Sequence, residues 1–411
     1  MKYFVVLGDG MADYPIKELG GKTPLEYSST PCMDELAPLS EIGLAATIPP
    51  GMKPGSDTAN LAVLGYDPQK YYSGRSPLEA LSIGINMDEA DIALRTNIVT
   101  ISDDDDLPFE ERIMIDHSAG DLTSEEAAPL LDACREVFEN EEFQFYLGTG
   151  YRHCCIWKGG KVLNLSQPHD YLTKPIGPVL PDKFGSDSPE DRKKFAWMCK
   201  KSFEILNHHP FNEERRRQGK HVANCLWFWG AGTKPSLDPF EEKYGKKGAM
   251  ISAVDLLKGI GKGTGMKVIE VPGANALLNT NYEGKANAAL DVCLKDGYDL
   301  AYVHVEAPDE MGHQGSFERK IQAIENLDQR VIRVIVEGMR KAGEPFRLLI
   351  TPDHPTPVSV RTHTSDPVPF MIYDSTKEQD HTWHYNEKEA KEAGLLVKPG
   401  YKLMSRFLEL E

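Results

Sequence analysis

Two short stretches of the chain combine aspartate and histidine at spacings suited to binding a metal ion. Asp309 and His313 are four residues apart, so both side chains would lie on one face of a helical turn and could reach one ion. Asp353 and His354 are adjacent, and His363 follows them in a polar segment. Each stretch comes directly after an apolar run that predicts a buried strand. We therefore expect the two stretches to deliver their side chains into one pocket.

Two residues nearer the N-terminus could join this pocket. Asp9 follows an apolar run and lies between Gly8 and Gly10, which let the backbone turn at the carboxyl end of a strand, where open α/β sheets bind ligands. Ser56 follows Gly55 at the predicted start of a helix, where backbone N–H groups favour a phosphate. Both positions also suit a simple helix cap. Ser56 becomes a candidate nucleophile because neighbouring metal ligands can lower the pKa of its hydroxyl.

Together these residues predict a two-metal phosphoryl-transfer enzyme. Carboxylates and imidazoles at strand ends suit two divalent ions about 4 Å apart. Imidazole combined with carboxylate favours zinc or manganese over calcium or magnesium, with magnesium as a further option. The candidate set is Asp9, Ser56, Asp309, His313, Asp353, His354 and His363.

The elements that position these residues predict an α/β fold with two domains. Residues 1–87 and 187–411 are expected to form a discontinuous core domain around a doubly wound, mostly parallel sheet. Residues 88–186 are expected to form a smaller inserted α+β domain, ending in a proline-rich linker at 174–181. Within the insert, 91–100 alternates like a half-exposed strand. Core strands are predicted at 3–7, 224–230, 267–271, 300–305 and 347–351, and core helices at 189–207, 284–295 and 317–341.

The composition of the chain argues against some classes of function. The net charge of −17 over 411 residues argues against a nucleic-acid binder, although local cations can still favour an anionic substrate inside a cleft. No run approaches the roughly 18 apolar residues that span a bilayer, and the start lacks the features of a signal peptide. The seven cysteines form no Cys-x-x-Cys pair, which suits reduced thiols. We expect a cytoplasmic enzyme without a membrane or nucleic-acid partner; the sequence indicates no oligomeric state.

The order of these motifs resembles that of the alkaline phosphatase superfamily and, within it, the archaeal-type 2,3-bisphosphoglycerate-independent phosphoglycerate mutases. The resemblance runs over nearly the whole chain and implies an alkaline-phosphatase-like core with an inserted lid domain. The matching segments are 8–13, 54–57, 74–80, 309–313, 351–354 and 362–370.

This resemblance implies the interconversion of 3-phosphoglycerate and 2-phosphoglycerate, with Ser56 as the nucleophile that becomes phosphorylated. It implies two divalent metal ions, no 2,3-bisphosphoglycerate, and a small phosphorylated metabolite as the substrate. The metals would stabilise the charge on the transferring group, and the lid would exclude water and carry cationic groups. One ion would be held by Asp9, Ser56, Asp353 and His354, and the other by Asp309, His313 and His363.

The chain departs from the family pattern in the inserted domain. The family has an arginine-rich loop, Asp-Arg-Arg-Ala-Gly-Arg, where this chain reads Asp-His-Ser-Ala-Gly-Asp at 116–121. Histidine or serine is a poor replacement for a guanidinium that clamps a phosphate or carboxylate at two points. The candidate substrate-binding residues are therefore Asp116, His117, Arg152, Arg75 and Lys285.

The same departure leaves other functions open. It resembles a subgroup proposed to act as homoserine kinases, whose acceptor carries an ammonium group that Asp116 and Asp121 would tolerate. Phosphoglycerate mutase leads on whole-chain resemblance, and a homoserine-kinase-like phosphotransferase is the alternative. A metal-dependent hydrolase of phosphate or sulfate esters would share the core but would not need so large a lid. A non-catalytic protein that kept the metal site is a remoter alternative.

Overall fold

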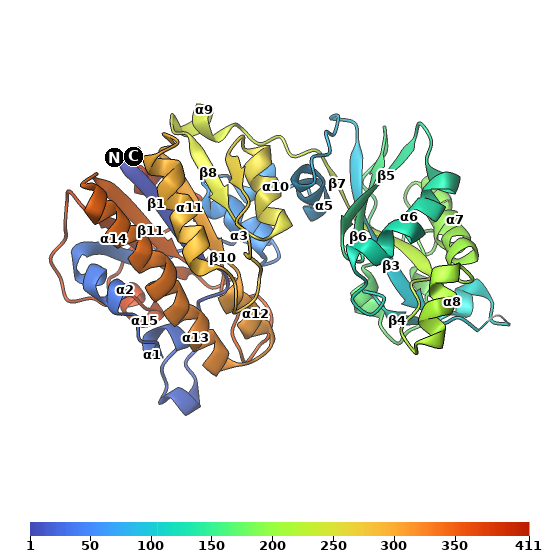
Figure 1. The fold of residues 1–411 in the computed structure, drawn as a ribbon, viewed down its shortest axis with the longest axis horizontal. Coiled ribbons are helices and arrows are strands. Elements are labelled where there is room, and N and C mark those ends of the chain that lie inside the picture. Colours follow the sequence, from blue (N-terminus) through green and yellow to red (C-terminus); the bar gives the residue numbers. More distant parts are fainter. Residues whose placement is uncertain (105, 411) are drawn as a thin grey trace. The chain divides into compact units, whose positions relative to one another are not determined.

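The computed structural model describes residues 1–104 and 106–410 and divides the chain into two compact units (Figure 1). Unit 1 comprises Met1–Tyr72 and Ser236–Glu411, and unit 2 comprises Ser73–Pro235. Each unit has its own sheet and its own cluster of buried apolar side chains. The limits of these two units differ from the domain limits expected from the sequence.

Unit 1 is built on an eight-stranded, mostly parallel sheet, as predicted. Only β12 runs antiparallel to its neighbours. In β1 the five residues from Tyr3 to Leu7 are all buried, because the strand lies between β10 and β11 and both faces of the sheet are covered. The strands, in their order across the sheet, are β13 (Leu396–Val397), β2 (Ser40–Ala45), β12 (Val368–Asp374), β11 (Phe346–Thr351), β1 (Lys2–Gly8), β10 (Leu300–Val305), β8 (Gly248–Ile251) and β9 (Lys267–Ile269).

Helices cover both faces of this sheet. On one face α11, α13 and α14 pack over Phe4, Val6 and their neighbours (Figure 1). On the other face α3 contacts Tyr302 through Asn60, and Gly261 of α10 lies against Met250. The helices of unit 1 are α1 (Pro24–Tyr27), α2 (Pro31–Leu36), α3 (Ser56–Val63), α4 (Pro68–Tyr71), α9 (Phe240–Tyr244), α10 (Asp255–Gly263), α11 (Tyr282–Leu294), α12 (Ala307–His313), α13 (Phe317–Leu327), α14 (Arg333–Ala342), α15 (Glu387–Glu392) and α16 (Lys402–Phe407).

Unit 2 is built on a five-stranded sheet whose pairings are all antiparallel. Its central strand β3 is buried along its whole length, so the expectation of a half-exposed strand at 91–100 is wrong. The reason is that β6 and β7 pair with its two edges while α7 packs on β7 and α5 packs on β3. The strands are β3 (Ile92–Ile101), β4 (Met114–Asp116), β5 (Phe143–Thr149), β6 (Arg152–Trp157) and β7 (Cys225–Thr233), and the helices are α5 (Arg75–Ser82), α6 (Ser124–Phe138), α7 (Pro189–Leu206) and α8 (Pro210–Arg217).

The expected domain limits of 88 and 186 are too narrow. The predicted core strand at 224–230 is β7, which pairs with β3 of unit 2 because its apolar side chains complete that unit's core. The predicted core helix at 189–207 is α7, which packs on β7. The proline-rich segment 174–181 is not a linker: it buries Ile176, Val179 and Leu180 in the core of unit 2.

Two further observations concern the whole chain. Across 1–104 and 106–410, no helix combines the length and the apolar character needed to cross a membrane. All seven cysteines are free and buried.

Candidate metal centre

Asp9 enters the site from the end of β1. It follows the last strand residue and is fully buried. Gly10 then turns the chain with a φ of +58°, and a Cβ at Gly10 would lie 2.5 Å from side-chain oxygens of Asp309 and Thr356. The Gly10 N–H donates to Asp353 Oδ1 at 3.1 Å. A glycine is required here because the backbone must adopt a left-handed conformation and approach other site residues closely.

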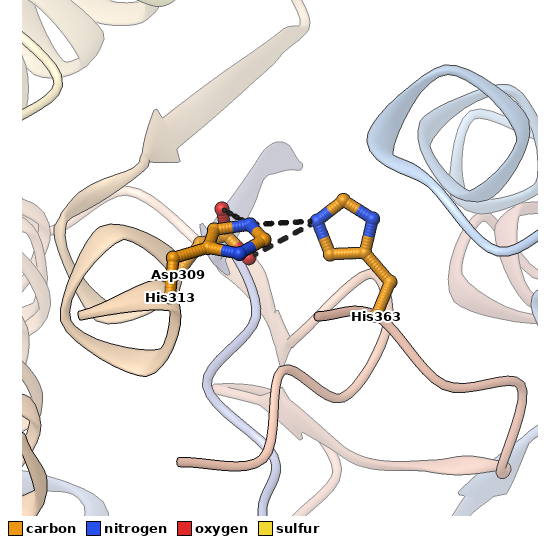
Figure 2. A group of neighbouring side chains, drawn as sticks. All are labelled: Asp309, His313 and His363. Atoms are coloured by element: carbon orange, nitrogen blue, oxygen red, sulfur yellow. Dashed lines mark hydrogen bonds and ion pairs between the residues drawn. The ribbon is translucent and has the colours of Figure 1, made fainter. Parts of the chain in front are cut away.

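Asp309, His313 and His363 form one group of candidate ligands (Figure 2). Asp309 and His313 lie one turn apart on α12, which begins just after β10, and His363 comes from the loop before β12. Asp309 Oδ2 lies 3.1 Å from His313 Nε2, and Asp309 Oδ1 lies 3.5 Å from His363 Nε2. The two imidazole Nε2 atoms are 3.0 Å apart. The helical spacing therefore places Asp309 beside His313, and the loop before β12 brings His363 to them.

The orientation of His313 is fixed from outside this group. Its Nδ1 lies 3.0 Å from the carbonyl oxygen of Arg361, which can only accept, so Nδ1 carries a hydrogen. Its Nε2 therefore faces Asp309, and the hydrogen bond between them raises the pKa of His313 to about 9. A cation that enters this group must displace that proton.

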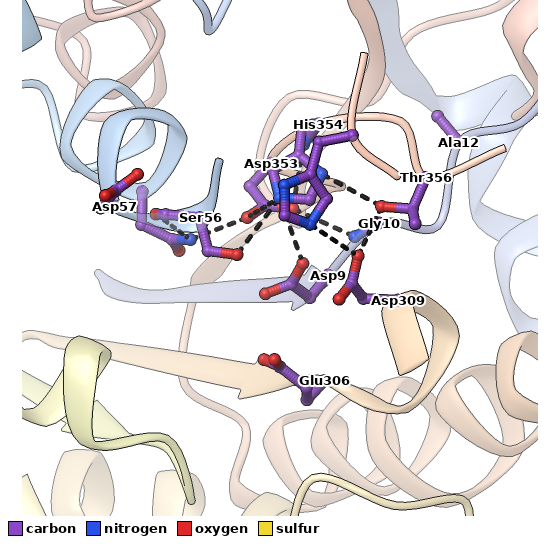
Figure 3. A network of polar contacts seen from close by, with 12 residues as sticks. Asp9, Gly10, Ala12, Ser56, Asp57, Glu306, Asp309, Asp353, His354 and Thr356 are labelled. Atoms are coloured by element: carbon purple, nitrogen blue, oxygen red, sulfur yellow. Dashed lines mark hydrogen bonds and ion pairs between the residues drawn. The ribbon is translucent and has the colours of Figure 1, made fainter. Parts of the chain in front are cut away.

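Asp9, Asp353 and His354 approach Ser56 in a second group (Figure 3). His354 Nε2 lies 3.2 Å from Ser56 Oγ, 3.6 Å from Asp9 Oδ1 and 3.4 Å from Asp353 Oδ2. Asp9, Asp353 and His354 are fully buried. Candidate ligand atoms of Asp9, Asp309 and His354 lie within 4.8 Å of one another, so Asp309 borders both groups.

Ser56 is the first residue of α3 and not its cap. Gly55 occupies the N-cap position, and no side chain there bonds the helix N–H groups. The Ser56 hydroxyl is therefore free to face His354. The helix is held against the site by Asn60, whose side-chain amide donates to Ser56 O and to Asp353 Oδ2, each at 2.9 Å. The alternative of a simple serine cap at Ser56 is thus wrong.

The electrostatics of the site favour cations. Burial, together with Asp353, raises the pKa of Asp9 well above its usual range, and Asp9 Oδ1 has no hydrogen-bond partner. Burial also acts to raise the pKa of Asp309, but hydrogen bonds from His313 and His363 hold it well below the usual range. Three buried carboxylates, Asp9, Asp309 and Asp353, lie close together, an unfavourable arrangement unless positive charge compensates it. The donor set of oxygen and nitrogen atoms fits divalent transition metals or zinc.

The predicted substrate-binding residues are divided between the two units. Lys285 lies in unit 1, where it is fully buried and donates to the carbonyl oxygen of His304 at 2.8 Å. Asp116 in unit 2 accepts hydrogen bonds from the backbone of Ser118 and Gly120, and His221 Nδ1 lies 2.8 Å from it, so its carboxylate is committed to its own loop. Burial also lowers the pKa of Lys285 to about 8, so its amino group is enclosed in the core of unit 1.

Arg75, Arg152 and His117 lie in unit 2 together with a residue that the sequence reasoning missed. Arg95 is 7% exposed, donates to Glu79 through Nε at 2.6 Å, and stacks over the ring of Trp229 at 4.7 Å. Arg75 also pairs with Glu79 at 3.1 Å.

His117 packs against Tyr151, and the Arg152 guanidinium lies over the same ring at 5.5 Å. Burial acts to raise the pKa of Glu79, but Arg95, Arg75 and Arg152 together lower it. We call Arg75, Arg95, Arg152 and Glu79 the guanidinium cluster. The cluster has a net positive charge, because three guanidinium groups surround one carboxylate.

The sequence reasoning also missed two residues near the candidate metal ligands. His304 lies within the apolar run of β10, and Glu306 follows that strand. Asp9, His304 and Glu306 present ligand atoms within 4.8 Å of one another. A histidine inside an otherwise apolar strand is a signal that could have identified His304, because burying such a group requires a specific partner.

Comparison with known proteins gives one family-model match and relatives that align with nearly the whole chain. Residues 37–212 match a family model described as 2,3-bisphosphoglycerate-independent phosphoglycerate mutase. The chain is 46% identical over 412 residues to a probable enzyme of that name from Geobacter sulfurreducens, covering 100% of both chains. It is 48% identical over 402 residues to the enzyme of that name from Methanosarcina barkeri, covering 97% of both.

Solved structures show the same relationship. A protein from Pyrococcus horikoshii is similar with a TM-score of 0.81 at 30% identity, over 100% of this chain and 97% of that one. The cofactor-independent phosphoglycerate mutase from Thermoplasma acidophilum gives a TM-score of 0.67 at 26% identity, over 100% of both chains. The α/β fold with a mostly parallel sheet is thereby confirmed.

Proposed function

The chain belongs to the 2,3-bisphosphoglycerate-independent phosphoglycerate mutase family, and from that membership we propose that it interconverts 3-phosphoglycerate and 2-phosphoglycerate through a phosphoserine at Ser56. One observation carries the assignment of Ser56. Its hydroxyl stands at the start of α3, 3.2 Å from His354 Nε2, beside the buried carboxylates of Asp9 and Asp353.

The reaction consists of two phosphoryl transfers. In the first, Ser56 Oγ forms a bond to phosphorus while the ester bond between phosphorus and the 3-oxygen of the substrate breaks. In the second, the 2-hydroxyl of the retained glycerate attacks the phosphoserine, the bond between phosphorus and Ser56 breaks, and the serine is regenerated. The backbone N–H groups at the start of α3 lie where they can stabilise negative charge on the transferring group.

Metal dependence belongs to the family, and we propose two divalent ions, manganese or zinc, in this chain. When bound, they supply positive charge that lowers the pKa of the Ser56 hydroxyl and stabilises the transferring phosphoryl group. The proposal is supported by the unpartnered Oδ1 of Asp9 and by the convergence of imidazole nitrogens on Asp309. The proposed ligands are Asp9, Ser56, Asp353 and His354 for one ion and Asp309, His313 and His363 for the other.

We further propose that the guanidinium cluster of unit 2 binds an anionic group of the substrate. The missing arginine-rich loop at 116–121 is then compensated by arginines from α5, β3 and β6. Arg95 is held by Glu79 and Trp229, so little conformational freedom would be lost when it binds a carboxylate. His117, which packs on Tyr151 beside Arg152, is proposed to border this site. A lid role for unit 2 stays a prediction.

The homoserine alternative loses part of its support. Asp116 and Asp121 were the residues expected to tolerate an ammonium-bearing acceptor, and the carboxylate of Asp116 is committed to Ser118, Gly120 and His221. We also propose a cytoplasmic location, in keeping with seven free, buried thiols.

The test is conversion of 3-phosphoglycerate by the manganese-loaded protein without added bisphosphoglycerate or nucleotide. We expect 2-phosphoglycerate as the main product, and no product from Ser56→Ala. Ser28→Ala is a matched control, because Ser28 donates only to the Pro24 carbonyl. Free phosphate as the main product would instead identify a hydrolase. No conversion, together with ATP-dependent phosphorylation of homoserine, would overturn the mutase assignment.

A further inference from the structure

His304 is a fully buried histidine with polar partners on both ring nitrogens. It lies near the end of β10, directly beside β1, where the register pairs it with Leu7. Its Nε2 lies 2.7 Å from Asp9 Oδ2, and its Nδ1 lies 3.1 Å from Ser252 Oγ. The Ser252 hydroxyl oxygen in turn accepts a hydrogen bond from the Val254 backbone N–H at 3.0 Å. Ser252, His304 and Asp9 thus form a continuous chain of contacts.

With Asp9 ionised, as a metal ligand must be, the direction of each hydrogen bond in this series can be assigned. An ionised carboxylate only accepts, so the hydrogen in the 2.7 Å contact with Asp9 then belongs to His304 Nε2. A neutral imidazole then has a lone pair on Nδ1, which accepts the hydroxyl hydrogen of Ser252. Within the described residues no other acceptor contacts that hydroxyl, while Val254 already occupies one of its lone pairs. A doubly protonated His304 would leave the Ser252 hydrogen without an acceptor.

The backbone at His304 is held as well. Lys285 Nζ donates to the His304 carbonyl oxygen at 2.8 Å, and β10 is paired on one side with β1 and on the other with β8. Glu306 Oε2 also lies near His304 Nε2, but at 3.4 Å, well beyond the 2.7 Å contact to Asp9. The single hydrogen on Nε2 is therefore donated to Asp9.

We infer that His304 and Ser252 are positioning residues that fix the carboxylate of Asp9. The inference rests on the proposed metal-dependent function. Because Oδ2 of Asp9 is engaged by His304, the unpartnered Oδ1 is the oxygen presented toward His354 and Ser56, where it would bind a cation. Ser252 selects the imidazole tautomer that makes this possible. Such outer partners orient metal ligands and commonly contribute 10- to 100-fold to metal affinity.

A pair of amide substitutions at His304 separates positioning from packing. In His304→Gln the side-chain amide can reach roughly the position of Nε2 and donate to Asp9. In His304→Asn the amide lies near the position of Nδ1, so it can bond Ser252 but falls short of Asp9. We expect the dissociation constant for Mn²⁺, measured by titration calorimetry on the full chain, to rise about tenfold or more in His304→Asn and much less in His304→Gln.

Ser252→Ala tests the contact between Ser252 and His304. Without the serine hydrogen either imidazole tautomer is available, so we expect weaker Mn²⁺ binding than in the unmodified protein but stronger than in His304→Asn. Two buried residues of unit 2 provide matched controls: His153→Asn, where His153 Nδ1 accepts from Gly148, and Ser202→Ala, where Ser202 accepts from Leu226. Both controls should change stability without changing the Mn²⁺ dissociation constant.

The outcomes distinguish this inference from the proposed function. Equal Mn²⁺ affinities in His304→Gln, His304→Asn and the unmodified protein would overturn the positioning role while leaving the metal site in place. If His304→Gln and His304→Asn lose the same Mn²⁺ affinity, in proportion to their loss of thermal stability, then His304 has a packing role only. Absence of Mn²⁺ binding by the unmodified protein would instead overturn the proposed metal centre itself.

Discussion

At the scale of single residues, His313 links the charge of the site to pH. Its pKa is raised from 6.5 to about 9 by the hydrogen bond to Asp309, with burial opposing the shift. A raised folded pKa means that the stabilisation is fully present below about pH 6.5 and is lost as the pH rises through about 9. The metal-free protein should therefore become less stable between these values. The effect should be modest, because the side chain is 35% exposed and solvent weakens the pair.

Thermal unfolding of the chelator-treated protein at a series of pH values measures this effect. His313→Gln should flatten the profile between pH 6.5 and 9, because glutamine does not titrate. A profile in the unmodified protein that is flat, or that rises over this interval, would contradict the assignment of the shifted group.

Arg95 carries a prediction about the substrate. Its guanidinium is held by Glu79 and stacked on Trp229, a geometry that lysine cannot reproduce. We expect Arg95→Lys to raise KM for 3-phosphoglycerate about tenfold or more. Arg135→Lys is the matched control, since Arg135 is a partly exposed arginine of unit 2 that pairs with Asp132 and Glu139. An unchanged KM in Arg95→Lys would remove the guanidinium cluster from the substrate site.

Residue spacing explains what could be predicted at this scale. Asp309 and His313 are one helical turn apart, so their convergence follows from local geometry, and Asp9 follows from its place after an apolar strand. Arg95 lies in a segment that alternates like a half-exposed strand, and His304 lies inside an apolar run, so neither pattern identifies the partner of the residue. Their partners, Glu79 and Ser252, are brought to them only by tertiary packing.

At the scale of elements, the long helix predicted at 317–341 is interrupted. A π-helical turn at Asp328–Ile332 separates α13 from α14. Asp328 lies at the start of this turn and accepts hydrogen bonds from the backbone N–H groups of Cys32 and Met33, at the start of α2. The apolar period continues through the turn, so the sequence predicts one helix and does not reveal the link to α2.

Removing the hydrogen bonds between Asp328 and α2 should lower the stability of the protein without changing its activity. Asp328→Ala leaves two buried N–H groups without their charged acceptor, so we expect a loss of about 2 kcal/mol in the free energy of unfolding. Asp328→Asn keeps one acceptor oxygen and should lose less. Denaturant unfolding measures both variants, and turnover per folded molecule should stay unchanged. A loss in Asp328→Asn as large as in Asp328→Ala would show that the hydrogen bonds to α2 are not the cause.

At the scale of the whole molecule, the division of the chain into two units depends on pairing between strands that are far apart in the sequence. Sequence patterns locate β7 and α7 but not the sheet to which they belong, since both follow the expected insert and resemble core elements. The pairing of β7 with β3 assigns them to unit 2.

The observed limits of unit 2 and the limits expected from the sequence can be compared by preparing each segment as a fragment. A fragment of residues 73–235 contains the complete sheet and core of unit 2 and should unfold cooperatively. A fragment of residues 88–186 lacks β7 and α7, so one edge of β3 and part of the core of unit 2 would be exposed. This shorter fragment should not unfold cooperatively. Circular dichroism during thermal unfolding distinguishes them. Cooperative unfolding of the shorter fragment would contradict the observed limits.

The central claim concerns the bond formed at Ser56 and can be tested on the protein itself. The manganese-loaded chain is mixed with 3-phosphoglycerate and quenched in acid within a turnover, and its peptides are analysed by mass spectrometry. We predict a phosphoryl group on Ser56, absent when metal is removed with a chelator and absent in Ser56→Ala. Turnover without phosphorylation of Ser56, or continued production of 2-phosphoglycerate by Ser56→Ala, would contradict the account.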